Sequence, residues 1–240
     1  VNVVSFQKIS DTDGGFSGVL ADEDNFGCEL EALGDMNGDG AADIAVGAYR
    51  NDGGGADRGA VWIVFMNTDG TVASEQKIGD SLGGFGGTID DYDVFGASLT
   101  SIGDLNGDSV VDIAVGAYMD DDGSSSSDRG AVWVLFMNSN GTVNSHQKIS
   151  DTEGGFSGVL GNGDFFGFSL TSIGDLNGDT VNDLAVGAPF DDDGGTDRGA
   201  VWILFMNTDG TVASHQKISD TEGSFTGELN NEDNFGSSVS

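Results

Sequence analysis

Apolar residues recur along the chain in short runs separated by polar, glycine-rich stretches. In the middle of the chain four such runs follow one another, at residues 98–102, 113–118, 131–137 and 142–149. They are rich in β-branched and aromatic residues and are bounded by Asn, Asp and Gly, which is typical of strands rather than helices. Residues 131–137 are apolar at every position, so we expect both faces of that strand to be buried. The pattern predicts an all-β protein.

Turn residues indicate how these strands are joined. Asn138-Ser139-Asn140-Gly141 is a hairpin signal, and Asp69-Gly70 and Asp209-Gly210 stand at the same place in two other copies. One unit is therefore predicted to be four antiparallel strands in about 70 residues. A lone sheet of this kind would expose an apolar face, so we expect the units to stack face on face. Burial of large side chains, worth ~1.5–3 kcal/mol each, should supply most of the stability.

The four-strand unit repeats along the chain. Phe-Gly pairs begin at residues 26, 95, 166 and 235, which are 69, 71 and 69 residues apart. The spacing predicts three complete units, at residues 27–95, 96–166 and 167–235. Residues 1–26 match the end of a preceding unit, and residues 236–240 match the start of a following one. We expect the sequence to be part of a longer array, or a protomer that completes its units with a neighbouring copy.

Each unit also carries a nine-residue acidic loop, at residues 35–43, 104–112 and 175–183. Oxygen-bearing side chains occupy loop positions 1, 3, 5 and 9, while the residues between them vary. Hard cations prefer several oxygen ligands, and the backbone carbonyl at position 7 would add another. The predicted metal ligands are Asp35, Asn37, Asp39, Ala41 and Asp43; Asp104, Asn106, Asp108, Val110 and Asp112; and Asp175, Asn177, Asp179, Val181 and Asp183. We expect one Ca²⁺ in each loop, three in total.

The acidic loops differ from the EF-hand loop, with which they share the opening Asp-x-Asn-x-Asp. An EF-hand needs Glu at position 12, whereas Val46, Val115 and Val186 stand there. The following residues favour a strand and not a helix. The alternative is an Asx-type turn that binds no metal; repetition of the same four oxygen positions in three copies favours Ca²⁺.

Together, Phe95-Gly96, the loop at residues 104–112 and Val115-Gly116-Ala117 resemble the FG-GAP repeat of integrin α-subunit β-propellers. In the third copy the signature ends in Pro189, whereas Tyr49 and Tyr118 stand at that position in the first two. The resemblance implies tandem propeller-type blades with one Ca²⁺ per acidic loop. Propellers of this family usually close with seven blades, which at this period requires about twice this length.

Composition limits the possible partners. The 240 residues carry a formal net charge of −33, which excludes nucleic acid as a partner because its recognition needs a basic surface. No apolar run approaches the ~20 residues of a membrane span. The chain begins at Val1 and not at Met, which indicates a processed or excised segment. The single Cys28 is expected to be a small packed residue.

Several other residues occupy repeated positions. Arg58, Arg129 and Arg198 share one position and are expected to pair with acidic loops of the same or the next blade. His146 and His215 align with residues other than His, so we expect them to be exposed on a strand. Three pairs of readings stay open here. Trp62, Trp133 and Trp202 would be core residues or, less favoured, a carbohydrate-stacking platform. The acidic triplets at 120–122 and 191–193 would be solvated or hold a second cation. The sequon at Asn140 would be a turn or carry a glycan.

No catalytic constellation is visible, and the sequence leaves three function classes. The first is a non-enzymatic, extracellular, calcium-stabilised structural or adhesive surface or filament element that acts through blade stacking. Its partners would be further repeats or neighbouring copies, with extracellular protein or glycan also possible. The second is a ligand-recognition propeller of the integrin type that binds a protein or glycan on its loop face. The third, an enzyme, would need a unique His/Arg/Tyr cluster that breaks the repeat, and none is seen.

Overall fold

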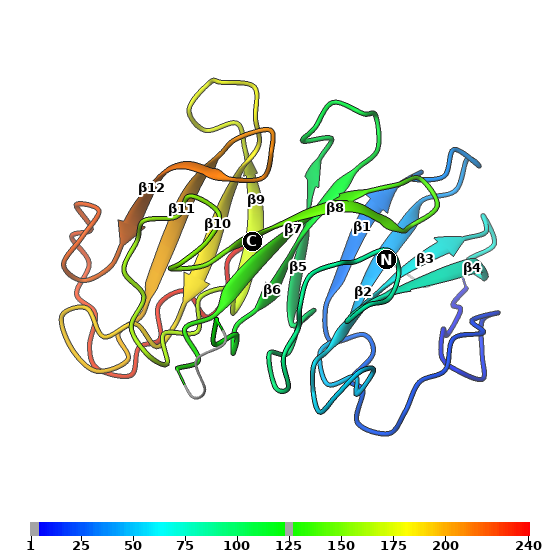
Figure 1. The fold of residues 1–240 in the computed structure, drawn as a ribbon, viewed down its shortest axis with the longest axis horizontal. Helices are drawn as coiled ribbons and strands as arrows, with labels where there is room; N and C mark the ends of the chain where they lie inside the picture. Colours follow the sequence, from blue (N-terminus) through cyan, green and yellow to red (C-terminus); the bar gives the residue numbers. More distant parts are fainter. Residues whose placement is uncertain (1–4, 123–126) are drawn as a thin grey trace.

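The computed structural model describes residues 5–122 and 127–240 as three four-stranded antiparallel sheets (Figure 1). In each sheet the strands follow chain order. The first sheet holds β1 (Leu30–Gly34), β2 (Asp43–Ala48), β3 (Ala60–Met66) and β4 (Val72–Ile78). The second holds β5 (Ser98–Gly103), β6 (Asp112–Ala117), β7 (Ala131–Met137) and β8 (Val143–Ile149). The third holds β9 (Ser169–Gly174), β10 (Asp183–Ala188), β11 (Ala200–Met206) and β12 (Val212–Ile218). We call these sheets blades 1, 2 and 3.

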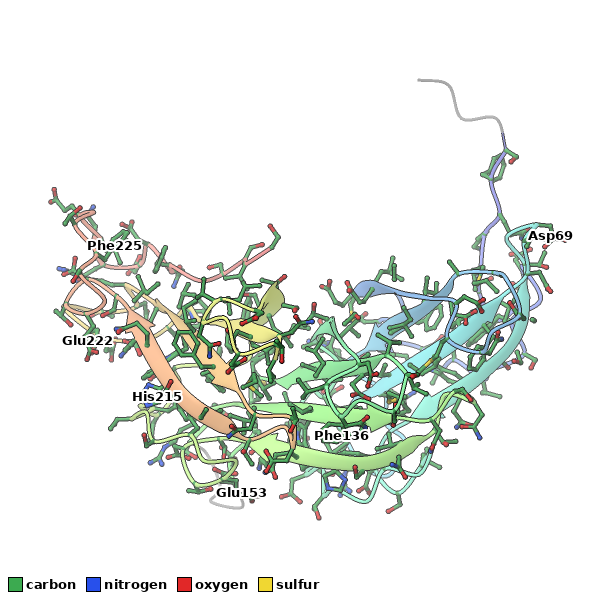
Figure 2. All side chains as sticks on the ribbon, turned by 90° about the horizontal axis from the view of Figure 1, so that it is seen from above. Asp69, Phe136, Glu153, His215, Glu222 and Phe225 are labelled. Atoms are coloured by element: carbon green, nitrogen blue, oxygen red, sulfur yellow. The ribbon has the colours of Figure 1, made fainter. Side chains whose placement is uncertain are left out.

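The predicted all-β architecture of tandem propeller-type blades is confirmed. The fully apolar run at 131–137 is β7, and all seven of its residues are buried, as expected for a strand covered on both faces. Seen from above, the three blades follow one another along an open arc, with Asp69 near one end and Phe225 near the other (Figure 2). Among the described residues no helix is long and apolar enough to cross a membrane.

Neighbouring blades share their apolar cores. One cluster joins Ala45 and Ile63 of blade 1 to Ile113 and Leu135 of blade 2. A second cluster joins Val134 and other residues of blade 2 to the strands of blade 3 in the same way. The first strands lie at the closest contacts, β1 against β5 and β5 against β9. Stacking therefore buries both faces of blade 2, which removes from water the surface that a lone sheet would expose.

Small residues allow this close packing. A methyl group on Gly116 of β6 would collide with the backbone oxygen of Gly167 and with the hydroxyl of Ser98. The Ser98 hydroxyl itself donates to Gly167 O at 2.7 Å, so the two backbones approach directly. Gly47 and Gly187 have the same relation to the Phe-Gly pair that follows each of them. The Gly of the Val-Gly-Ala sequence thus sets the distance between blades.

The segments between blades hold both of their neighbours. We call residues 79–97 and 150–168 the connectors. In the first connector, Gly83 O accepts a hydrogen bond from Val143 N of blade 2 at 2.8 Å. The Phe85 ring packs edge-on against Trp133 of blade 2, with ring centroids 5.1 Å apart. Further along, Phe95 N donates to Arg58 O of blade 1 at 2.9 Å. A connector is therefore fastened to the blade before it and to the blade after it.

Candidate metal-binding loops

Each acidic loop joins the first strand of a blade to the second. In blade 2 it lies between β5 and β6, and its last residue, Asp112, is the first residue of β6. The equivalent residues Asp43 and Asp183 begin β2 and β10. Because the strand order is the same in all blades, the three loops lie at the same end of their sheets.

In the first half of the loop, side-chain oxygens accept hydrogen bonds from backbone amides of the same loop. Asp108 N donates to Asp104 Oδ1 and to Asn106 Oδ1, both at 2.9 Å. Ser109 N donates to Asp104 Oδ2 at 2.8 Å. Blades 1 and 3 repeat these bonds within 0.1 Å, from Asp39 N and Asp179 N. The oxygens of positions 1 and 3 therefore converge on one backbone amide in every blade.

The carboxylate at position 9 has a separate role that the sequence did not reveal. Asp112 is fully buried, and its Oδ2 accepts from Leu105 N at 3.0 Å. Its Oδ1 accepts from Met137 N, at the end of β7, at 2.9 Å. Asp43 bonds to Met36 N and Met66 N, and Asp183 bonds to Leu176 N and Met206 N. The position-9 carboxylate thus ties the loop to the third strand of its blade, which is β7 in blade 2.

The two halves of the loop differ in electrostatics. Backbone and side-chain hydrogen bonds from Ala41 and Asn37 hold the pKa of Asp39 below its usual value. Backbone bonds, led by that of Thr180, do the same for Asp175. In contrast, burial raises the pKa of Asp112 to about 6, although its bonds from Met137 and Leu105 act in the opposite direction. A cation beside the loop would favour the charged form of such a carboxyl.

The predicted donor set of each loop suits a hard cation, because all the predicted ligands are oxygens. The structure brings together positions 1, 3 and 5, while the two position-9 oxygens accept from one amide of the loop and one amide of the third strand. In residues 5–122 and 127–240 there is no group of three or more His, Cys, Asp or Glu side chains that could hold a metal ion. Each loop combines its carboxylates with an Asn amide oxygen and a backbone carbonyl. The ligand set therefore stays a prediction.

The three repeated arginines pair with carboxylates, but these lie in the segment after the blade and not in the acidic loops. Arg58 contacts Asp80 at 2.8 Å and Asp91 at 2.7 Å, both in the connector that follows blade 1. Arg129 bonds to Asp151 and Asn162, and Arg198 bonds to Asp220 and Asn231, at the same places in the repeat. Each arginine is thus used within its own repeat.

In each acidic triplet the first and last carboxylates pair with a lysine, an arrangement that neither reading of the sequence, solvated charge or a second cation, included. Lys148 of β8 contacts Asp120 Oδ1 at 2.7 Å and Asp122 Oδ1 at 2.5 Å. In blade 3, Lys217 lies 2.6 Å from both Asp191 and Asp193. Asp120 and Asp191 are buried and not solvated, since a lysine amine stands between the carboxylates. The periodic recurrence of Lys in the fourth strand was the sequence signal for this arrangement.

The aromatic residues confirm one expectation and correct another. Trp133 is only 5% exposed, as a core residue should be, and the Lys148 amine lies 5.5 Å from the centre of its ring. His146 was expected to be exposed, but it is half-buried, 5.0 Å from the ring of Phe85. His215 packs in the same way against Phe156 at 4.9 Å. The connectors, which cover the fourth strands, cause this difference.

Two smaller expectations also have outcomes. Cys28, expected to be packed, is exposed, with its sulfur 3.7 Å from Gly96 O. Asn140 acts as a turn residue, because its side-chain oxygen accepts from Thr142 N at 3.1 Å and from the Thr142 hydroxyl at 2.7 Å.

The fold and its loops define a class: a repeat protein of stacked β-propeller-type blades, each with an acidic oxygen-rich loop. A model of the FG-GAP repeat matches residues 31–64, 95–135 and 166–204, one match in each blade. The chain belongs to the FG-GAP repeat family.

Its relatives include integrin alpha subunits. Integrin alpha-PS5 of Drosophila melanogaster is 34% identical over 156 residues, which cover 65% of this chain and 14% of that protein. Human integrin alpha-6 is 32% identical over 165 residues, covering 68% of this chain and 12% of the integrin. Mouse integrin alpha-2 is 35% identical over 96 residues, which cover 39% of this chain and 7% of the integrin. The chain thus matches 14% or less of the length of these relatives.

Proposed function

We propose that this chain is a calcium-stabilised, extracellular segment of FG-GAP blades that serves adhesion by binding another macromolecule, and that it is not an enzyme. The observation that carries the proposal is the acidic loop, whose hydrogen bonds recur within 0.1 Å at positions 1, 3 and 5 of all three blades. Similarity to integrin alpha subunits supports the same class of function. The proposed blade limits are residues 27–95, 96–166 and 167–235.

The loop residues would act mechanically. Bound Ca²⁺ would supply positive charge that offsets repulsion among the carboxylates of the loop. Asp104 and Asn106 already face one amide, and Asp108 holds the next turn through Val110 N at 2.9 Å. Asp112 connects this turn to β7 through Met137 N, so a loop held in one conformation would also stabilise the sheet. Loops of this kind suit the millimolar calcium of extracellular fluids.

Removal of calcium tests this proposal. A site held at 100 times its dissociation constant stabilises the folded state by about 2.7 kcal/mol. With three sites, EDTA should therefore lower the melting temperature by more than about 10 °C. Calorimetric titration of the calcium-free chain should give three calcium ions per chain. The control is NaCl at the same ionic strength, which separates binding from screening of the net charge. Equal melting curves in EDTA and calcium would contradict the proposal.

A second candidate function, structural stacking, is favoured by the two outer faces of the arc. Leu30 of blade 1 is 58% exposed, whereas its equivalents Leu99 and Leu170 are buried between blades. On blade 3, Leu176 is 59% exposed, whereas Met36 and Leu105 are buried. Both outer faces thus present side chains that elsewhere in the molecule are covered by another blade. The proposed partner is a further blade of the same kind, in a longer chain or in a neighbouring copy.

Sedimentation of the 240-residue chain tests stacking between copies. We expect association that increases with concentration, and the double variant Leu30→Glu/Leu176→Glu should remain monomeric. The matched control is Val159→Glu, because Val159 is 82% exposed but lies in a connector. A wild-type chain that stays monomeric at high concentration, or association that persists in the double variant, would contradict stacking between copies.

A further inference from the structure

One pair of buried polar residues marks the contact between each blade and the segment that leads into it. In blade 2 the pair is Asp93 of the connector and Asp120 of the loop after β6. In blade 3 it is Asp164 and Asp191. In blade 1 the same positions hold Asp24 and Asn51. All six residues are at most 5% exposed.

Blade 1 satisfies its pair with hydrogen bonds. Asn51 Nδ2 donates to Asp24 Oδ2 at 2.8 Å. Asn51 Oδ1 accepts from the Lys77 amine at 2.5 Å and from Gly53 N at 2.9 Å. An amide donor therefore meets a carboxylate acceptor, and every polar atom of the Asn side chain has a partner.

Blade 2 has the same arrangement but lacks the donor. Asp120 Oδ1 accepts from the Lys148 amine at 2.7 Å and from Asp122 N at 2.9 Å, so its side chain is oriented like that of Asn51. Its second oxygen consequently occupies the place of the Asn51 amide nitrogen, which in blade 1 donates to the Asp24 carboxylate. No donor among the described residues reaches this oxygen. By analogy with blade 1, the two carboxyl groups face each other, and both residues are at most 5% exposed, so that they cannot both be charged without a large penalty.

The surroundings do not supply the missing positive charge. A cleft of about 490 Å³ beside the pair is lined by the further ionisable groups Asp90, Asp122, Glu153, His146 and Lys148. Lys148 is already shared between Asp120 and Asp122, and burial lowers the pKa of His146. Burial, followed by the charge of Asp120, raises the pKa of Asp93 to about 8.

Blade 3 repeats this arrangement in a weaker form. Its cleft of about 710 Å³ has Asp192, Asp193, Glu222, His215 and Lys217 around the pair. Asp191 Oδ1 accepts from Asp193 N at 3.0 Å, and Lys217 approaches the other oxygen at 2.6 Å. Burial, followed by the charge of Asp191, raises the pKa of Asp164 to about 6. The lower value agrees with the placement of the lysine on the oxygen that Lys148 does not contact.

We propose that Asp93 and Asp120 share one proton, that Asp164 and Asp191 do the same, and that these pairs make the blade junctions sensitive to pH. With the proton bound, one carboxyl donates to the other, as Asn51 donates to Asp24. When the second carboxyl ionises, the two repel each other and the connector is held less firmly. Asp93 lies two residues before Phe95, whose amide is bonded to blade 1, so the repulsion acts where the chain crosses between blades.

The sign of the pH effect follows from proton linkage. An unfolded Asp has a pKa of about 3.9, so above about pH 4 the folded state holds more protons than the unfolded state. Stability from each pair is complete below about pH 4 and falls as the pH rises. The loss is complete above about pH 6 for Asp164 and above about pH 8 for Asp93. These groups are separate from the acidic loops, so the proposal does not depend on calcium binding.

Carbon-13 NMR of Asp-labelled full chain, titrated in the presence of calcium, tests the shared proton. We expect one carboxyl signal with a midpoint near pH 8 and another near pH 6, both well above the usual Asp value. Asp120→Asn should abolish the first and leave the second, because it recreates the chemistry of blade 1 while keeping the oxygen that Lys148 uses. Asp191→Asn should likewise abolish the signal near pH 6, which separates that signal from any contribution of Asp112, whose pKa burial also raises to about 6.

The matched gain-of-function variant is Asn51→Asp, which should add a third carboxyl signal with a raised midpoint. If all wild-type Asp carboxyls titrate below about pH 5, the proposal is wrong. It is equally wrong if the late signal persists in Asp120→Asn, since that signal would then belong to another group.

Discussion

Replacing Asp112 by alanine is expected to lower the free energy of unfolding by about 2–6 kcal/mol, even when no calcium is present. The substitution leaves Leu105 N and Met137 N, both in buried hydrogen bonds, without an acceptor, and each such loss costs about 1–3 kcal/mol. Urea denaturation in EDTA and in calcium would measure this effect. In calcium the loss should be larger, because a predicted ligand is also removed.

Asp108→Ala is the matched control, since Asp108 lies in the same loop but is exposed. In EDTA its replacement should change stability by less than about 1 kcal/mol, whereas in calcium it should remove a ligand. If Asp112→Ala costs no more than Asp108→Ala in EDTA, then position 9 does not anchor the loop to β7. A comparison of the two variants therefore separates the anchoring role from the proposed metal-binding role.

Replacing Lys148 by methionine should lower the free energy of unfolding at pH 7 by about 3–5 kcal/mol, because it leaves carboxylates buried without their partner. The Lys148 amine is the counter-charge of Asp120 and Asp122, whose side chains are 3% and 16% exposed. Denaturation of the Lys148→Met variant at decreasing pH would provide a second test. Stability should partly return in acid, because protonated carboxyls no longer need the amine.

Lys8→Met provides the control at the same position of the repeat. The Lys8 side chain is 69% exposed and its amine lies 3.4 Å from Asp13, so the pair should be worth less than about 1 kcal/mol. A small loss of stability in Lys148→Met, similar to that of Lys8→Met, would show that the buried ion pairs do not contribute as described.

The strand pattern and the acidic loops could be predicted because they depend on local features. The run at 131–137 became β7 with the same limits, since an unbroken series of β-branched and aromatic residues can be satisfied only by burial. Repetition supplied the blade number and indicated where acidic loops and arginines recur. Pairing of Arg58 with a carboxylate could be expected because an acidic residue recurs at the position of Asp80 in every copy, as Asp151 and Asp220.

Other features depended on contacts between segments far apart in the chain. Asp120 and Lys148 are 28 residues apart, and only the fold of the blade brings them together. The sequence pattern therefore left the acidic triplets as solvated charge or a cation site. His146 was expected to be exposed because the connector that covers it comes from residues 79–97, outside its own sheet.

By itself, the sequence determined the strands, the repeat, the family resemblance and the chemical type of each loop, because these follow from residue type and spacing. The tertiary structure alone decided which atoms meet. It turned Asp112 toward the amide of Met137, and it placed Asp93 and Asp120 beside one cleft, at the positions where blade 1 has Asp24 bonded to Asn51. The physical reason is that a charge pattern is visible in a sequence, whereas burial and hydrogen-bond direction arise only when blades and connectors pack together.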